Sequence, residues 1–91
     1  MTNSWLSAAD IEARLQAALA PEALAVDDDS HLHAGHAGAR SGGHFTVRVT
    51  SARFAGLARL ARHRLVYDAL GSLDAQGVHA LAIVAKAPGE P

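Results

Sequence analysis

The sequence predicts a small α+β domain whose elements follow one another in the order α-β-β-α-α-β. Three observations support this fold class. The chain has 91 residues, which is enough for one small domain and too few for two. Apolar residues recur at helical spacing in two segments, and they alternate or cluster as in strands in three others.

The first half of the chain predicts one helix and two strands. The helix is expected to start after Ser7, a residue type that caps helices, and to stop before Pro21. Its inward face recurs at helical spacing, with Ile11, Leu15, Ala18 and Leu19. Residues 24–26 predict a short strand. Residues 44–50 alternate between apolar and polar types, which predicts a strand with one buried face.

The second half predicts a turn, a helix and a last strand. Residues 51–56 are expected to form a single capped turn with a break near Gly56. The following helix is expected to face the core with His63, Val66, Tyr67, Leu70 and Leu73. Gly71 or Gly77 is expected to end this region, and the apolar run from residue 78 to residue 86 predicts the third strand.

Domain organisation follows from these elements. We expect a flexible tail over residues 1–6, a single domain over 7–88 and a short tail over 89–91. Residues 30–43 have no periodicity and are rich in glycine, which predicts a long mobile loop. Four of the six histidines lie between His31 and His44. Histidine is the commonest metal ligand, so this segment carries the main compositional indication of chemistry.

Composition excludes several classes of function. Eight Lys and Arg residues against nine Asp and Glu give a net charge of −1, so the whole molecule does not attract nucleic acid or an anionic membrane. No apolar run approaches the ~18–20 residues of a membrane span, and the first residues do not resemble a signal peptide. We therefore expect a cytoplasmic protein. The absence of cysteine excludes disulfides, thiol catalysis and thiolate ligands from this chain.

Five short motifs occur in order along the chain. They are Asp29-Ser30-x-x-His33, His44-Phe45, Ser51-x-x-Phe54-x-Gly56, Arg62-His63-Arg64-Leu65-Val66-Tyr67-x-x-Leu70 and Val78-His79-Ala80-Leu81. Together they resemble the BolA family, over about Ile11 to Pro88. The resemblance implies a class II KH-like fold, with a three-stranded mixed sheet and helices packed on one face.

The resemblance also implies a partner and a cofactor. BolA-like proteins pair with monothiol glutaredoxins around a shared 2Fe–2S cluster, to which glutathione also contributes. Carried over, the metal ligands are His79 and His33, with His31 and His36 as alternates because they flank His33. A chain without thiolates cannot hold such a cluster alone, but it can supply imidazole to one iron.

The residues leave other interpretations of these histidines open. His79 shares a strand side with Leu81 and Ile83, so it could instead be a hydrogen-bonded residue at the rim of the core. The cluster His31-x-His33-x-x-His36 could bind zinc, nickel or copper opportunistically, since a glycine-rich loop is a poor scaffold for a dedicated site.

A basic helix raises a second hypothesis. Arg59, Arg62 and Arg64 could contact DNA phosphates, and the family resembled is often described as transcriptional regulators. The GxxG loop of KH domains is missing between the helices, however, and aromatic residues are few. Arg62 and His63, with His79, could instead contact the glutaredoxin. We expect the isolated protein to be a monomer or a weak homodimer.

Catalysis is not expected. Ser30 and Ser51 lack the setting of an activated nucleophile, and no paired carboxylates lie where the end of a strand would present them. The sequence therefore predicts a protein that is not an enzyme.

Overall fold

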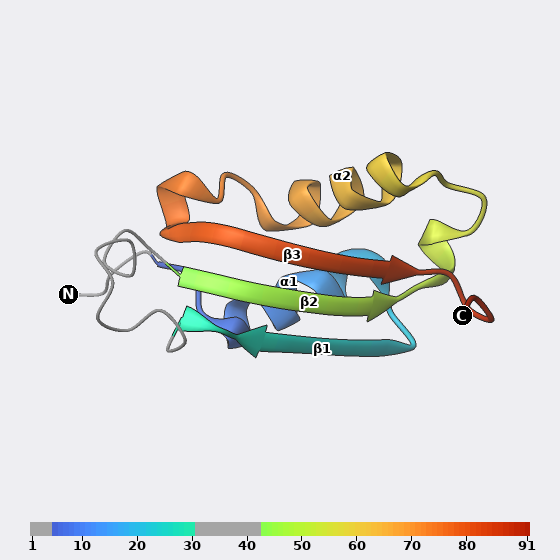
Figure 1. Cartoon of the computed structure of the whole chain (residues 1–91), viewed down its shortest axis with the longest axis horizontal. Helices are drawn as coiled ribbons and strands as arrows, with labels where there is room; N and C mark the ends of the chain where they lie inside the picture. Colours follow the sequence, from blue (N-terminus) through green and yellow to red (C-terminus); the bar gives the residue numbers. More distant parts are fainter. Residues whose placement is uncertain (1–4, 31–42) are drawn as a thin grey trace.

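The computed structural model describes residues 5–30 and 43–91. The elements in these ranges are α1 (Ala8–Leu19), β1 (Ala23–Asp28), β2 (Gly43–Thr50), η3 (Ala52–Phe54), α2 (Arg59–Leu70), η4 (Asp74–Gln76) and β3 (Val78–Lys86). The predicted order is confirmed, with the single turn η3 in the place of the short fourth element (Figure 1). Of the predicted loop, only Ser30 and Gly43 lie within the described residues.

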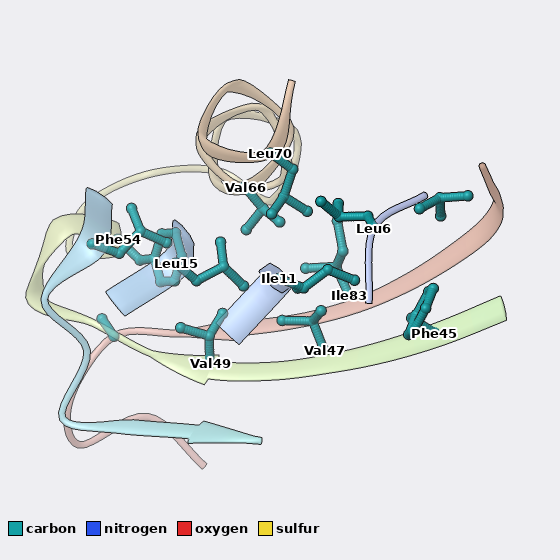
Figure 2. Packing of buried hydrophobic residues seen from close by; sticks show 13 residues of the cluster. Leu6, Ile11, Leu15, Phe45, Val47, Val49, Phe54, Val66, Leu70 and Ile83 are labelled. Carbon is teal, nitrogen blue, oxygen red and sulfur yellow. The ribbon is translucent and has the colours of Figure 1, made fainter. Parts of the chain in front are cut away.

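The three strands form one mixed sheet in the order β1-β2-β3. β1 and β2 are antiparallel, whereas β2 and β3 are parallel. Both α1 and α2 lie on the same side of the sheet, and no helix of residues 5–30 and 43–91 lies on the other side (Figures 1 and 2). This arrangement confirms the α+β fold expected from the sequence.

α1 begins and ends where the sequence predicts. The Ser7 hydroxyl accepts a hydrogen bond from the Asp10 N–H (3.1 Å), and the Asp10 carboxylate accepts one from the Ser7 N–H (2.9 Å). This reciprocal cap satisfies two backbone donors at the helix N-terminus. It also lowers the pKa of Asp10, because the backbone and hydroxyl of Ser7 stabilise the charged carboxylate. The inward face of the helix is fully buried at Ile11 and Leu15.

β2 supplies the centre of the core. Phe45, Val47 and Val49 point from the strand toward the helices, as the alternation predicts (Figure 2). They meet Val66 and Leu70 of α2, both of which are buried. The alternate side chains of β2, which begin with His44, therefore belong to the face of the sheet opposite α1 and α2.

The predicted inward face of α2 is wrong at Tyr67, which is 42% exposed. The buried stripe instead runs through Val66 and Leu70, with Leu65 and Ala69 partly buried beside them. Arg62 lies on this stripe. Its Nε donates to the Leu57 carbonyl (2.8 Å) and its Nη1 to the Ala85 carbonyl (3.2 Å). Arginine can bury its aliphatic stem while its charged group binds polar atoms. The buried face of α2 therefore includes Arg62 and differs from the face that the apolar pattern predicts.

Both predicted tails are too long at their inner ends. Leu6 is only 6% exposed, and its N–H donates to the Gln76 carbonyl (2.8 Å). At the other end, Glu90 accepts two hydrogen bonds from Arg62, at 2.5 and 2.8 Å. Leu6 and Glu90 are therefore part of the folded domain. None of the helices in the described segments is long and apolar enough to cross a membrane.

Candidate metal and partner site

His79 lies in an irregularity at the start of β3. Gly43 is paired with Val78 and His44 with Ala80, so the parallel register skips His79. Such bulges change the direction of a side chain and are common beside functional sites. His79 is exposed, whereas its neighbour Val78 is buried. The position of His79 differs in this respect from a histidine packed at the rim of the core.

His44 begins the regular part of β2, and the Asp29-Ser30 motif holds its backbone on both sides. The His44 N–H donates to the Ser30 hydroxyl (2.9 Å), and the His44 carbonyl accepts from the Asp29 N–H (2.7 Å). The Asp29 carboxylate also accepts a hydrogen bond from the Thr46 hydroxyl (2.6 Å). The residues that follow β1 therefore fix the backbone position from which the His44 side chain extends.

The two imidazoles lie next to each other. The ring centroids of His44 and His79 are 5.1 Å apart, and the ring planes are tilted by 51°. The Nε2 atom of His44 is shielded from water, while His79 is exposed. A group that binds this pair from solution would therefore approach it from the His79 side.

Two glycines allow the chain segments to meet here. The Gly43 N–H donates to the Gly77 carbonyl (2.7 Å), which joins the start of β2 to the turn before β3. A Cβ atom on Gly43 would lie 2.6 Å from the Phe45 ring, and one on Gly77 would lie 2.4 Å from the Trp5 ring. Gly77 also has a φ of 79°, which other residue types rarely adopt. Side chains at these positions would separate the segments that bring the histidines together.

A shallow open pocket of about 390 Å³ adjoins His79. Tyr67 of α2 contributes to its wall, together with Ser72 and Asp74 from the segment between α2 and β3. The starts of β2 and β3, η4 and the C-terminal end of α2 all gather at this end of the molecule (Figure 1). Tyr67 is exposed, contrary to the prediction from the sequence, and its aromatic ring therefore lines part of this pocket.

The other sequence-predicted site residues within the described ranges all lie on α2. His33, His31 and His36 lie outside the described residues. Arg62 contacts Ala85, which is about 20 Å along β3 from His79 at the usual rise of a strand. Its side chain is only 13% exposed, because its guanidinium group binds within the chain. His63 is half-buried on α2, whereas Arg59 and Arg64 are exposed.

The donor atoms available here fit two kinds of metal group. The chain has no cysteine, so it cannot supply the thiolates that ordinarily hold an iron–sulfur cluster. An exposed imidazole at the edge of a pocket can nevertheless bind one iron of a cluster whose sulfur ligands come from other molecules. Imidazole is also a good ligand for zinc, nickel and copper ions.

Sequence and structure comparisons identify the family. The family model described as BolA-like protein matches residues 15–90. The chain belongs to the BolA family. It is 49% identical over 82 residues to BolA-like protein 1 from Mus musculus, covering 90% of this chain and 58% of the mouse protein. The chain therefore spans little more than half the length of that relative.

Two further BolA comparisons agree with this assignment. The BolA domain of SufE1 from Arabidopsis thaliana superimposes with a TM-score of 0.79 and 43% identity, covering 92% of this chain and 94% of that domain. The DNA-binding transcriptional regulator BolA from Vibrio cholerae is 47% identical over 73 residues, covering 80% of this chain and 67% of that protein. The resemblance to the BolA family that the motifs predicted is therefore confirmed.

His44 and Tyr67 are the residues of this site that the sequence analysis did not select. His44 was part of the His44-Phe45 motif, but its strand position alone gave no reason to connect it with His79. The parallel pairing of β2 with β3 makes that connection. A pairing between two strands separated by a helix cannot be deduced from the periodicity of either strand.

Proposed function

We propose that this BolA-like protein is a non-catalytic, cytoplasmic partner of a monothiol glutaredoxin, with which it shares a 2Fe–2S cluster. The observation that carries the proposal is an exposed imidazole, His79, at a strand irregularity in a chain that has no cysteine. Membership of the family supports the choice of partner class, and the exposed position of His79 supports its proposed role as a ligand.

The chemistry of a shared cluster suits this donor set. In the proposed complex the glutaredoxin cysteine and glutathione supply sulfur ligands, and His79 binds one iron. His33 supplies the second imidazole, with His31 and His36 as the alternates. Replacement of thiolate by imidazole raises the reduction potential of a 2Fe–2S centre and makes its charge depend on pH. Such a cluster suits iron–sulfur trafficking or iron and redox regulation.

Anaerobic reconstitution tests this function. The protein is mixed with a monothiol glutaredoxin, glutathione, iron and sulfide, and the visible circular dichroism is compared with that of the glutaredoxin homodimer. We expect a new spectrum in a one-to-one complex, which H79A abolishes. Glu22→Gln is the control and should leave the spectrum unchanged, because Glu22 is exposed and binds Thr50, at the end of β2 opposite His44. A homodimer spectrum with no co-elution would contradict the proposal.

The loop ligand is tested in the same complex. Single substitutions of His31, His33 and His36 by alanine should distinguish the three histidines, and we expect H33A to change the spectrum most. Equal and small effects of all three would contradict the assignment of His33, while the assignment of His79 would stand on its own variant.

A second candidate function is DNA binding. α2 begins with Arg59, its N-cap Ala58 makes no side-chain hydrogen bond, and its first turn carries no acidic residue. The positive end of this helix therefore carries one exposed cation, Arg59, and a second, Arg64, follows five residues along the helix, an arrangement that favours phosphate. The Vibrio cholerae relative is described as a DNA-binding regulator.

Salt dependence tests this second candidate. Replacing Arg59 and Arg64 by alanine should weaken DNA binding and flatten the plot of log affinity against log salt by up to about two units, one for each lost phosphate contact. Arg62→Ala is not a useful probe because Arg62 binds Glu90. Binding that is undetectable at low salt, or a slope that the double variant leaves unchanged, would exclude this function.

A further inference from the structure

The described part of the chain itself contains a pair of neighbouring imidazoles. His44 and His79 come from parallel strands, and their ring centroids are 5.1 Å apart. Two imidazoles that bind one tetrahedral zinc ion, each through a nitrogen about 2.0–2.1 Å from the metal, place their centroids roughly 5 Å apart. The pair therefore has the separation that two ligands of a single ion require.

The backbone holds both histidines in place before any ion binds. Ser30 and Asp29 hold the N–H and the carbonyl of His44 through bonds of 2.9 and 2.7 Å. On the other strand, the N–H of Val78 donates to the Leu73 carbonyl at 3.0 Å, directly before His79. Each strand therefore presents its histidine from a fixed backbone position, which reduces the ordering of the chain that opposes binding.

The chemistry of the pair selects a class of metal. Both ligands are neutral nitrogens, and within residues 5–30 and 43–91 no group of three or more histidine, aspartate or glutamate side chains gathers around a common point. Imidazole without carboxylates favours zinc, nickel, cobalt or copper over magnesium and calcium. The remaining coordination positions would be open to water, as in metal sites that exchange ligands.

We propose that His44 and His79 form a two-imidazole site that binds one such divalent ion in the isolated protein. This site differs from the shared cluster in using His44 and in needing no thiolate and no partner. Binding is weak compared with a site that has four protein ligands, and it saturates at one ion for each chain.

Cobalt(II) titration of a full-length variant tests the site. H31A/H33A/H36A, without an affinity tag, removes the loop histidines, so His44, His63 and His79 are the histidines that remain. We expect one equivalent of cobalt to bind, detected by its visible absorption, and zinc to displace it. In this background H44Q and H79Q should each weaken binding at least about tenfold, since even outer partners of metal ligands cost about 10–100-fold when lost.

H63Q is the matched control and should bind cobalt as the background does. Nitrogen NMR of the histidine side chains provides a second measurement that needs no further substitution. Zinc should shift one ring nitrogen of His44 and one of His79 together, with the same dependence on concentration. A shift at His79 alone, no shift at either ring, or equal weakening by H63Q would overturn the proposal.

The outcome is separable from that of the proposed function. The titration contains no glutaredoxin, glutathione or sulfide, so its failure leaves the shared cluster untouched. Loss of the cluster spectrum in the reconstituted complex would, in turn, say nothing about cobalt binding by the chain alone.

Discussion

At the scale of single residues, the motifs predicted more of the candidate site's chemistry than of its geometry. His79 could be selected from the motif that contains it, and Asp29-Ser30 could be noticed as a pair. The role of Ser30 could not be predicted, because its hydroxyl accepts from the N–H of His44, far along the chain. Contacts between residues that are distant in sequence depend on strand pairing, which a local pattern does not specify.

The Ser30 hydrogen bond gives a prediction at this scale. Ser30→Ala leaves the half-buried N–H of His44 without its acceptor, which should lower the free energy of unfolding by about 1 kcal/mol. Urea denaturation measures this loss, and the amide of His44 should exchange its hydrogen faster. Ser72→Ala, at an exposed serine near the same end, is the control and should change neither quantity. Unaltered exchange at His44 in S30A would contradict the role given to Ser30.

At the scale of elements, the helices and strands were predictable because their residue patterns are local. The phase of α2 was not, because Arg62 replaces an apolar residue on the buried stripe and Tyr67 takes an exposed position beside His79. Hydrogen bonds to Leu57 and Ala85 explain the inward arginine. Neither acceptor is visible in the periodicity of the helix.

The turn before β3 gives a prediction for the element that presents His79. Gly77 and Gly56 have nearly the same φ, 79° and 77°, but only Gly77 has a neighbour within 4 Å of an added Cβ, the Trp5 ring at 2.4 Å. Gly56→Ala should cost about 1–2 kcal/mol from the left-handed backbone alone. Gly77→Ala should cost about 1–3 kcal/mol more, through overpacking against Trp5.

Urea denaturation of both variants measures the difference. W5A/G77A should lose the extra cost relative to W5A, because the ring that an added Cβ would meet is gone. Equal destabilisation by G56A and G77A would show that the Trp5 ring moves aside without loss, and would contradict the packing described here.

The Arg62–Glu90 pair gives a prediction for the C-terminal end of β3. Hydrogen bonds from Arg62 and from the Ala87 backbone lower the pKa of Glu90 from 4.5 to about 2. A carboxyl group whose pKa is lower in the folded state stabilises the fold above the pKa of the unfolded chain. This contribution is lost as the pH falls from about 4.5 through about 2.

Thermal unfolding of Glu90→Gln tests this pH dependence. The variant should have a lower Tm than the wild type at pH 7, and the difference should shrink as the pH falls toward 2. Glu22→Gln, at an exposed residue outside this pair, controls for the loss of one negative charge. A Tm difference that is independent of pH would contradict the coupling of Glu90 to the fold.

At the scale of the whole molecule, the order of helices and strands along the chain determines the fold. The pairing of the strands then determines which residues meet at the candidate site. α1 and α2 lie on one face of the sheet, and the parallel pairing of β2 with β3 places both strand starts at one end. This pairing brings together His44 and His79, with Tyr67 beside His79. The N-terminal segment, for which the sequence predicts a flexible tail, adds Trp5 beside Gly77. The sequence therefore predicted the family and selected His79, while the neighbourhood of His79 required the tertiary structure.

Nitrogen hyperfine spectroscopy of the reduced complex tests the central claim most directly. The protein is labelled with ¹⁵N-histidine and combined with unlabelled glutaredoxin, glutathione and the 2Fe–2S cluster. We predict strong ¹⁵N coupling to the reduced cluster, from which H79A removes the contribution of one imidazole and H63A removes none. A cluster that forms in the one-to-one complex without any ¹⁵N coupling would contradict the claim that this chain supplies an imidazole ligand.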